Sequence, residues 1–118
     1  MSIERIEIGP RMSQAVIHNH TIYLAGQVAS DDAGPGVYDQ TCSALAAIDR
    51  LLAAGGSDKS RLLSVTIWLT DMDTFGEMNR AWDGWVVAGA TPARATVLSA
   101  RLAAPQYRVE IGVVAAQS

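Results

Sequence analysis

The spacing of apolar and polar residues divides the chain into eight short elements. Alternation of apolar and polar positions, or a short apolar run bounded by turn residues, is typical of strands. These patterns predict strands at residues 3–8, 14–17, 21–28, 63–69, 93–102 and 108–115. Apolar residues recur every three or four positions after residue 37 and again after residue 74, as in amphipathic helices. We expect these helices to end at Gly55-Gly56 and near residue 87, so the predicted order is βββαβαββ.

Turn-forming residues support these boundaries. The polar segment 18–20 separates two apolar runs and predicts a hairpin. The pair Gly55-Gly56 provides a residue that can adopt the left-handed conformation closing the first helix. Thr74, followed three residues later by Glu77, fits a capping box at the start of the second helix.

Both helices must bury an apolar stripe, and the simplest arrangement places them on one face of a single mixed sheet. The other face of that sheet then carries Tyr23, Trp68 and Val114. Self-association is the most economical way to cover such a surface. The pattern therefore predicts an α+β domain that forms an oligomer.

The composition mainly argues against certain classes of protein, namely multidomain, nucleic-acid-binding, disulfide-bonded and membrane-spanning ones. With 118 residues, 49% of them hydrophobic, the chain is expected to form one domain spanning residues 1–118. The net charge is −3, and eight scattered arginines with the single lysine, Lys59, provide no concentrated basic face for nucleic acid. The single cysteine, Cys42, cannot form an intrachain disulfide, which favours a reducing compartment. No stretch approaches the ~20 apolar residues of a membrane span, so we expect a cytoplasmic protein without a nucleic-acid or membrane partner.

Several kinds of catalytic or metal site are disfavoured by spacing. His18 and His20 have no third ligand nearby, so we interpret them as turn residues and expect no metal. Cys42 has no basic residue close in sequence and is expected to be a small buried side chain. The serines lack a Gly-x-Ser-x-Gly motif, which argues against a hydrolase of that type.

Arg94 and Glu110 remain, each in an otherwise uncharged strand. The guanidinium of Arg94 could bind a carboxylate through two hydrogen bonds. By alternation, the side chain of Glu110 should point away from the side on which Val109 and Ile111 lie. Two solvated surface charges are the simpler interpretation from composition alone, and the sequence leaves open whether the two residues meet.

The same segments resemble the RidA family, also called YjgF or endoribonuclease L-PSP. The resemblance runs nearly end to end and is carried by residues 11–16, 22–27, 75–82, 92–97 and 109–111. It implies a chorismate-mutase-like α+β fold with two helices on one face of a mixed sheet. It also implies a homotrimer with ligand clefts between adjacent subunits.

For members similar to RidA, the activity is hydrolysis of reactive 2-imino acids and their enamine tautomers to 2-oxo acids and ammonia. Examples of the substrates are 2-iminobutanoate and 2-iminopropanoate, which damage pyridoxal-phosphate enzymes if they persist. The resemblance makes Arg94 the carboxylate-binding residue and Glu110 the residue that positions or activates water, with no metal or organic cofactor. The other substrate-binding positions that it implies are Met12, Asn79, Ala95 and Thr96.

Three positions depart from the family pattern and indicate a divergent member with an altered pocket wall. Met12 stands where RidA proper has an aromatic residue, Ala25 where a serine is common, and Thr96 where RidA proper has cysteine. Asn79 also has a purely structural interpretation, which is to tie the second helix to a neighbouring loop.

Two other functions compete with deaminase activity. The same cleft and Arg94 could serve a module that binds or senses small carboxylates such as 2-oxo acids without turnover. Ribonuclease activity, suggested by one of the family names, is disfavoured by the net charge of −3 and the absence of a basic patch.

Overall fold

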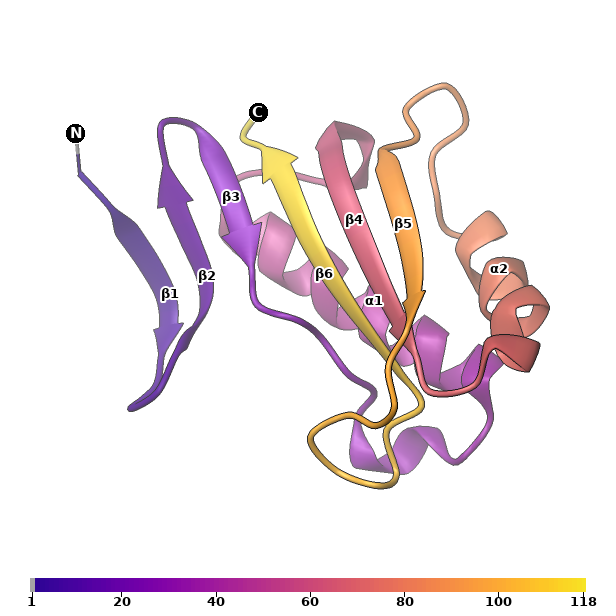
Figure 1. The fold of residues 1–118 in the computed structure, drawn as a ribbon. Helices are drawn as coiled ribbons and strands as arrows, with labels where there is room; N and C mark the ends of the chain where they lie inside the picture. Colours follow the sequence, from indigo (N-terminus) through magenta and orange to yellow (C-terminus); the bar gives the residue numbers. More distant parts are fainter. Residues whose placement is uncertain (1) are drawn as a thin grey trace.

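The computed structural model describes residues 2–118, which form a six-stranded sheet and two α-helices (Figure 1). The strands are β1 (Glu4–Ile8), β2 (Ser13–His18), β3 (Thr21–Leu24), β4 (Leu62–Leu69), β5 (Ala93–Leu98) and β6 (Val109–Ala116). The helices are α1 (Val37–Ala54) and α2 (Phe75–Asp83), and short 3-10 turns lie at Asp31–Ala33, Lys59–Arg61 and Met72–Thr74. The predicted element order is confirmed.

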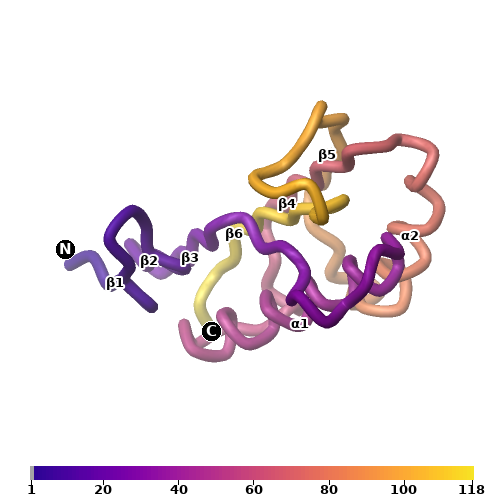
Figure 2. Tube along the Cα trace, turned by 90° about the horizontal axis from the view of Figure 1, so that it is seen from below, coloured from indigo at the N-terminus to yellow at the C-terminus, as the bar shows by residue number. Residues whose placement is uncertain are grey.

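The strand order in the sheet is β1-β2-β3-β6-β4-β5. Only β4 and β5 pair in parallel, and the other neighbours are antiparallel, so the sheet is mixed as predicted. Both helices lie on the same side of the sheet (Figures 1 and 2). This arrangement confirms the predicted α+β fold and leaves β1 and β5 as the two sheet edges.

The core lies between the sheet and the helices. In β6, Val109, Ile111 and Val113 are at most 2% exposed and alternate with half-buried residues, as a strand with one buried face requires. Each large buried side chain contributes roughly 1.5–3 kcal/mol relative to exposure. The largest of them are Ile22, Leu45, Ile48, Leu51, Leu52, Ile67, Leu69, Met78 and Ile111.

The outer face of the sheet, opposite the helices, carries the apolar residues predicted for it. Tyr23 pairs with Val114 across β3 and β6 and is 49% exposed. Trp68 of β4 is half-buried and pairs with Glu110 of β6. Cover of this face by another copy of the chain stays a prediction.

The predicted hairpin and the end of the first helix are confirmed. Asn19 and His20 have φ values of 51° and 63°, the left-handed pair of a two-residue hairpin turn between β2 and β3. After α1 ends, Gly56 has φ 78°, which a residue with a side chain rarely adopts.

The capping box predicted at Thr74 is wrong. The Thr74 hydroxyl donates instead to the carbonyl of Asp71, at 2.6 Å, because a 3-10 turn precedes α2. The Glu77 carboxylate caps the other helix: its Oε2 accepts the N–H groups of Val37 and Tyr38, at 3.0 and 3.2 Å. A carboxylate at a helix N-terminus satisfies free donors and interacts favourably with the helix dipole. Glu77 therefore joins α2 to the start of α1.

The strand predicted at residues 21–28 is interrupted. It leaves the ladder after Leu24 and returns only at Gln27, which forms an isolated bridge with Ile111. The two backbone hydrogen bonds of this bridge measure 2.8 and 2.9 Å. This break at Ala25 and Gly26, the bend after β3, lies next to the candidate site.

The strand predicted at residues 93–102 and the helix predicted at 74–87 also end early. After β5 the Ser99 hydroxyl donates to the carbonyl of Arg101, a local bond that turns the chain away from the sheet. In α2, Gly84 follows the last helical residue and lowers the helix propensity. The N–H of Trp85 then closes a tight turn onto the carbonyl of Trp82.

Cys42 is exposed, so the expectation of a buried cysteine is wrong. The residues of α1 that face the sheet include Thr41 and Leu45, both at most 1% exposed. Cys42 lies one residue, or about 100°, round the helix from Thr41, and this places it on the outer side.

Candidate functional site

Arg94 lies on the helix side of edge strand β5. In the parallel pairing of β4 with β5 it is level with Val65, whose side chain is in the core. Its guanidinium carbon is 5.2 Å from the centre of the Trp82 ring and 5.9 Å from that of Phe75. Both aromatic residues belong to α2, so packing of α2 on the sheet edge fixes the position of the half-buried Arg94 side chain.

The Arg94 guanidinium has no acidic partner among residues 2–118. The two ion pairs in this part of the chain join Arg50 to Glu7 and Arg108 to Asp71. Stacking on aromatic rings shields one face of a guanidinium and leaves its N–H groups directed outward in the plane. Arg94 is therefore arranged to bind a planar anion such as a carboxylate.

The backbone of β5 offers further donors, but not at Ala95. The N–H of Ser99 donates to the carbonyl of Leu69 in β4, at 2.8 Å. Because backbone groups alternate in direction along a strand, those of Ala95 also point toward β4, whereas the N–H groups of Arg94 and Thr96 point to the open edge. The N–H of Thr96 is thus open to a ligand and that of Ala95 is not, and substrate binding at these two positions stays a prediction.

The Thr96 side chain lies on the same face as that of Arg94. Its register partner, Ile67, is fully buried beneath the helices. The Thr96 hydroxyl oxygen is itself buried and has no hydrogen-bond partner among residues 2–118. Buried hydroxyls usually have such a partner, so this polar atom near the open edge is free to accept or donate one.

Asn79 lies on α2 between the two aromatic residues that contact Arg94. The spacing of Phe75, Asn79 and Trp82, four and then three residues, puts them on one helix face. Its amide makes no hydrogen bond within residues 2–118, so the structure gives no support to a tie between α2 and a loop. Asn79 thus shares the helix face that flanks Arg94.

Glu110 lies on the opposite, outer face of the sheet. It alternates with buried Val109 and Ile111, which confirms the predicted direction of its side chain. It opens into a groove of about 580 Å³ between the bend after β3 and the loop before β6. The groove is lined by Met12, Gln14, Ala25, Gly26, Gln27, Val28, Ala103, Tyr107 and Glu110. Two of the predicted departures from the family pattern, Met12 and Ala25, are therefore walls of this groove.

Gly26 and Gln27 shape the groove around Glu110. A Cβ built on Gly26 would overlap Oε2 of Glu110 and lie 2.8 Å from its carboxyl carbon, so the carboxylate packs directly on the glycine backbone. Gln27 is 8% exposed, and its amide donates to Oε1 of Gln14 at 2.9 Å and to the carbonyl of Ala25 at 3.0 Å. These bonds fix the bend that brings Gly26 against Glu110.

Arg94 and Glu110 do not meet within one chain. They project from opposite faces of the sheet, Arg94 beside Val65 and Glu110 beside Trp68. Two strand spacings across the sheet and three residues along β4 separate their backbones by roughly 14 Å. A small ligand cannot contact both side chains of the same copy, so each copy carries two separate candidate half-sites, one at Arg94 and one at Glu110.

Sequence reasoning did not assign a role to the aromatic residues beside Arg94 or to Gly26. Phe75 and Trp82 were part of an apolar helical stripe, which predicts burial but not contact with an arginine on another element. For Gly26, the available signal was a glycine in the middle of a predicted strand, since such a residue often marks a close approach or a bulge.

The other polar groups considered form no comparable site. His18 lies at the end of β2 and His20 in the following turn, and residues 2–118 contain no group of three or more potential metal ligands. No helix in this part of the chain has the length and apolar content needed to cross a bilayer.

Comparison with known proteins identifies the family to which the chain belongs. The endoribonuclease L-PSP family model matches residues 3–117. The RutC family protein YoaB of Escherichia coli K12 is 48% identical over 116 residues, covering 98% of this chain and 99% of that protein. A mouse protein named 2-iminobutanoate/2-iminopropanoate deaminase is 36% identical over 115 residues, covering 93% and 83%.

Solved structures agree with the sequence comparison. A crystal structure of a member of the YjgF protein family from Neisseria meningitidis has a TM-score of 0.95 and 47% identity, covering 100% of this chain and 97% of that one. A crystal structure of a protein from Salmonella typhimurium has a TM-score of 0.86 and 46% identity, covering 98% of this chain and 97% of that one. The fold, the end-to-end match and the shared sequence together show that this chain belongs to the endoribonuclease L-PSP family, which is also known as the YjgF or RidA family.

Proposed function

We propose that the protein hydrolyses small 2-imino acids to 2-oxo acids and ammonia at a site formed by two copies of the chain. One observation carries this proposal. Arg94, which packs against two aromatic rings and has no acidic partner among residues 2–118, lies on one face of the sheet, and Glu110 lines a groove on the other face. One copy supplies Arg94, and the neighbouring copy supplies Glu110. The mouse relative named as a deaminase of this class supports the choice of substrate.

Arg94 binds the substrate carboxylate. Its fork-shaped guanidinium can donate two parallel hydrogen bonds to a carboxylate, and the outward N–H of Thr96 adds a third donor at the same strand edge. A carboxylate held in this way fixes the position of the adjacent imine carbon. Fixed geometry of this kind removes much of the entropic barrier to reaction.

Glu110 activates the attacking water and transfers protons. Water oxygen adds to the imine carbon as Glu110 takes one water proton, and Glu110 then passes that proton to the former imine nitrogen to give a carbinolamine. The hydroxyl proton then leaves through Glu110 to the nitrogen, the C–N bond breaks, and ammonia departs from the new C=O group. The sum is imine plus water giving 2-oxo acid plus ammonia, with no change in oxidation state.

A homotrimer with clefts between subunits provides the pairing of half-sites. Arg94 lies at the β5 edge, and Tyr23, 49% exposed, forms part of the apolar outer face near Glu110's strand. Head-to-tail contact of one copy's edge with the outer face of the next repeats around a closed ring. The same contact covers apolar surface and completes the site.

The direct test measures ammonia and 2-oxo acid release from imines that an amino-acid oxidase generates in situ. Arg94→Ala and Glu110→Gln should each remove most of the acceleration without changing the oligomer. Arg101→Ala, at an exposed arginine, serves as the matched control and should retain full activity. No acceleration by the wild-type protein over several imines, in an intact oligomer, would contradict the proposal.

A carboxylate-binding module is the second candidate, because Arg94 and the β5 edge form a binding half-site that does not contain Glu110. In that case 2-oxo acids bind saturably, binding requires Arg94, and Glu110→Gln has no effect. Ribonuclease activity has less support, since the net charge is −3 and RNA binding relies on concentrated positive charge.

A further inference from the structure

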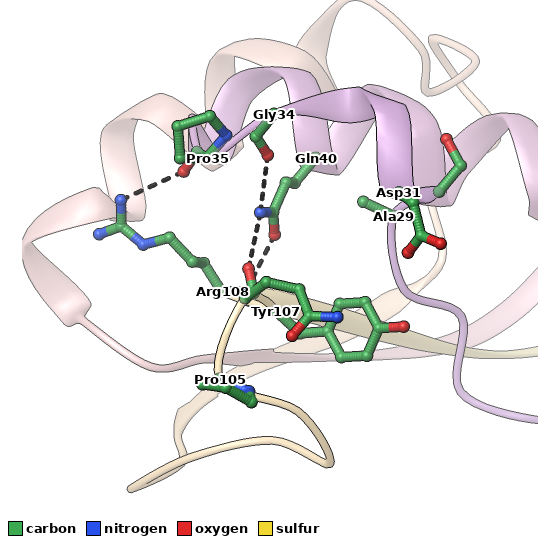
Figure 3. A pocket seen from close by; sticks show the side chains of 10 residues that line it. Ala29, Asp31, Gly34, Pro35, Gln40, Pro105, Tyr107 and Arg108 are labelled. Atoms are coloured by element: carbon green, nitrogen blue, oxygen red, sulfur yellow. Dashed lines mark hydrogen bonds between the residues drawn. The ribbon is translucent and has the colours of Figure 1, made fainter.

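The loop before β6 separates two hollows of the molecule. On one side is the groove that contains Glu110. On the other is a cavity of about 250 Å³ between this loop and the segment from Ala29 to Pro35 (Figure 3). Tyr107 lines both hollows, and it also lines a third, of about 240 Å³, beneath the turn after β5. Its side chain therefore stands where the three spaces approach one another.

The backbone on both sides of Tyr107 is held by one buried side chain. Gln40 of α1 is 3% exposed, and its amide nitrogen donates to the carbonyls of Gln106 at 2.9 Å and Gly34 at 3.0 Å. Its amide oxygen accepts the N–H of Arg108 at 2.9 Å, as Figure 3 shows. Such a satisfied buried amide fixes its partners strongly.

A further bond closes the loop itself. The N–H of Tyr107 donates to the carbonyl of Ala104, at 3.2 Å. The hydroxyl of Tyr107 has no hydrogen-bond partner among residues 2–118 and sits at the far end of the ring from the backbone (Figure 3). The residue is thus held through backbone hydrogen bonds, and its hydroxyl takes no part in holding it.

We propose that Tyr107 determines substrate specificity by closing the Glu110 groove against the neighbouring cavity. The inference rests on the proposed function and concerns the substrate side chain. With the ring in place, the end of the groove next to Tyr107 is closed, and 2-imino acids with short side chains, such as those derived from alanine and 2-aminobutyrate, are preferred. Removal of the ring joins the groove to the adjoining space, which then accommodates longer apolar side chains, such as those derived from leucine and methionine.

The test compares kcat/KM for short and long imines in the wild type and in Tyr107→Phe, Tyr107→Leu and Tyr107→Ala. In the Ala variant we expect the ratio of long to short substrates to rise at least about tenfold, which is within the range that a hydrophobic pocket can discriminate. The Phe variant should match the wild type, and the Leu variant should be intermediate. The Leu variant keeps the test valid if the Ala variant does not fold. An unchanged ratio in folded Ala or Leu variants would overturn the inference.

A second measurement separates this inference from the proposed function. Calorimetry with pyruvate and with 4-methyl-2-oxopentanoate reports selectivity for the same side chains without any turnover. If the wild type accelerates no imine, the deaminase proposal fails, but a rise in preference for the longer 2-oxo acid in Tyr107→Ala still supports a closing role for the ring. If neither ratio changes, the assignment of Tyr107 is wrong.

Discussion

Mixed assemblies test whether Arg94 and Glu110 act from different copies. Arg94→Ala and Glu110→Gln each destroy one half-site and leave the other half-site of the same copy intact, because the two residues project from opposite faces of the sheet. Separately, each variant should have lost most of its activity. When the two variants are unfolded and refolded together, some interfaces will pair the intact Arg94 of one variant with the intact Glu110 of the other.

The expected recovery follows from the geometry. A site works only where an Arg94-bearing copy is followed around the ring by a Glu110-bearing copy. With equal amounts and random assembly, this occurs at about one quarter of the interfaces in any closed head-to-tail ring. The mixture should therefore recover about one quarter of the wild-type activity per chain, whereas a site formed within one chain predicts none.

The assay is ammonia release from an in situ imine, measured after co-refolding and again after mixing without refolding. The double variant Arg94→Ala/Glu110→Gln, refolded with an equal amount of the Arg94→Ala protein, is the matched control and should recover nothing. Intact oligomers that contain both single variants yet remain inactive would refute the shared site. The shared site would also be refuted if activity returned fully when the two assembled variants were mixed and no chains exchanged between their oligomers.

Three further predictions concern stability and site geometry. Glu77→Ala should lower the free energy of unfolding by about 1–2 kcal/mol in urea titration, because the α1 N-terminus loses a charged cap. Gly26→Ala should lower kcat by up to about 100-fold while leaving the fold intact, because the new methyl group displaces the Glu110 carboxylate. The hydrogen bonds from the Ser60 hydroxyl and N–H hold the pKa of Asp58 below its usual 3.8. Asp58 therefore stabilises the fold fully above pH 3.8, and this stabilisation is lost as the pH falls through the lowered pKa. Unfolding titrations at several pH values should show this loss in the wild type and not in Asp58→Asn.

Matched substitutions separate these effects from nonspecific damage. Asp83→Ala removes an exposed carboxylate at the end of α2 and should leave the unfolding free energy within about 0.5 kcal/mol of wild type. Gly76→Ala adds a methyl group where no atom lies within 4 Å, and it should retain kcat. Equal losses in Glu77→Ala and Asp83→Ala would contradict the capping role of Glu77, and equal kcat in the two glycine variants would contradict the contact with Glu110.

Periodicity was sufficient to predict the element order, the single sheet and the side on which Glu110 lies. Strand and helix periods depend on local backbone geometry, which the sequence encodes directly. Two of the failures arose where a distant partner decided the outcome. Glu77 appeared to cap its own helix, but it caps α1, 40 residues away in sequence. The strand that includes Gly26 is interrupted, because it must pass beside the side chain of Glu110.

The candidate site shows the same division between local and distant information. Arg94 and Glu110 stood out as charges in apolar strands, yet no local pattern revealed that they lie on opposite faces. That result depends on the register of β5 and β6 against β4, which is a property of the assembled sheet. The stacking of Trp82 on Arg94 likewise requires α2 to pack over the β5 edge.

The Gln40 amide forms hydrogen bonds with backbone groups of Gln106 and Arg108, which lie 66 and 68 positions further along the sequence. These bonds involve no charged group. Hydrogen bonds between uncharged buried groups are insensitive to ionic strength, whereas attraction between a half-exposed guanidinium and a carboxylate is screened by salt. Carboxylate binding by Arg94 and the side-chain preference set by the loop that Gln40 holds therefore respond differently to ionic strength. Added salt should weaken the binding of every 2-oxo or 2-imino acid by a similar factor and leave the preference among their side chains unchanged.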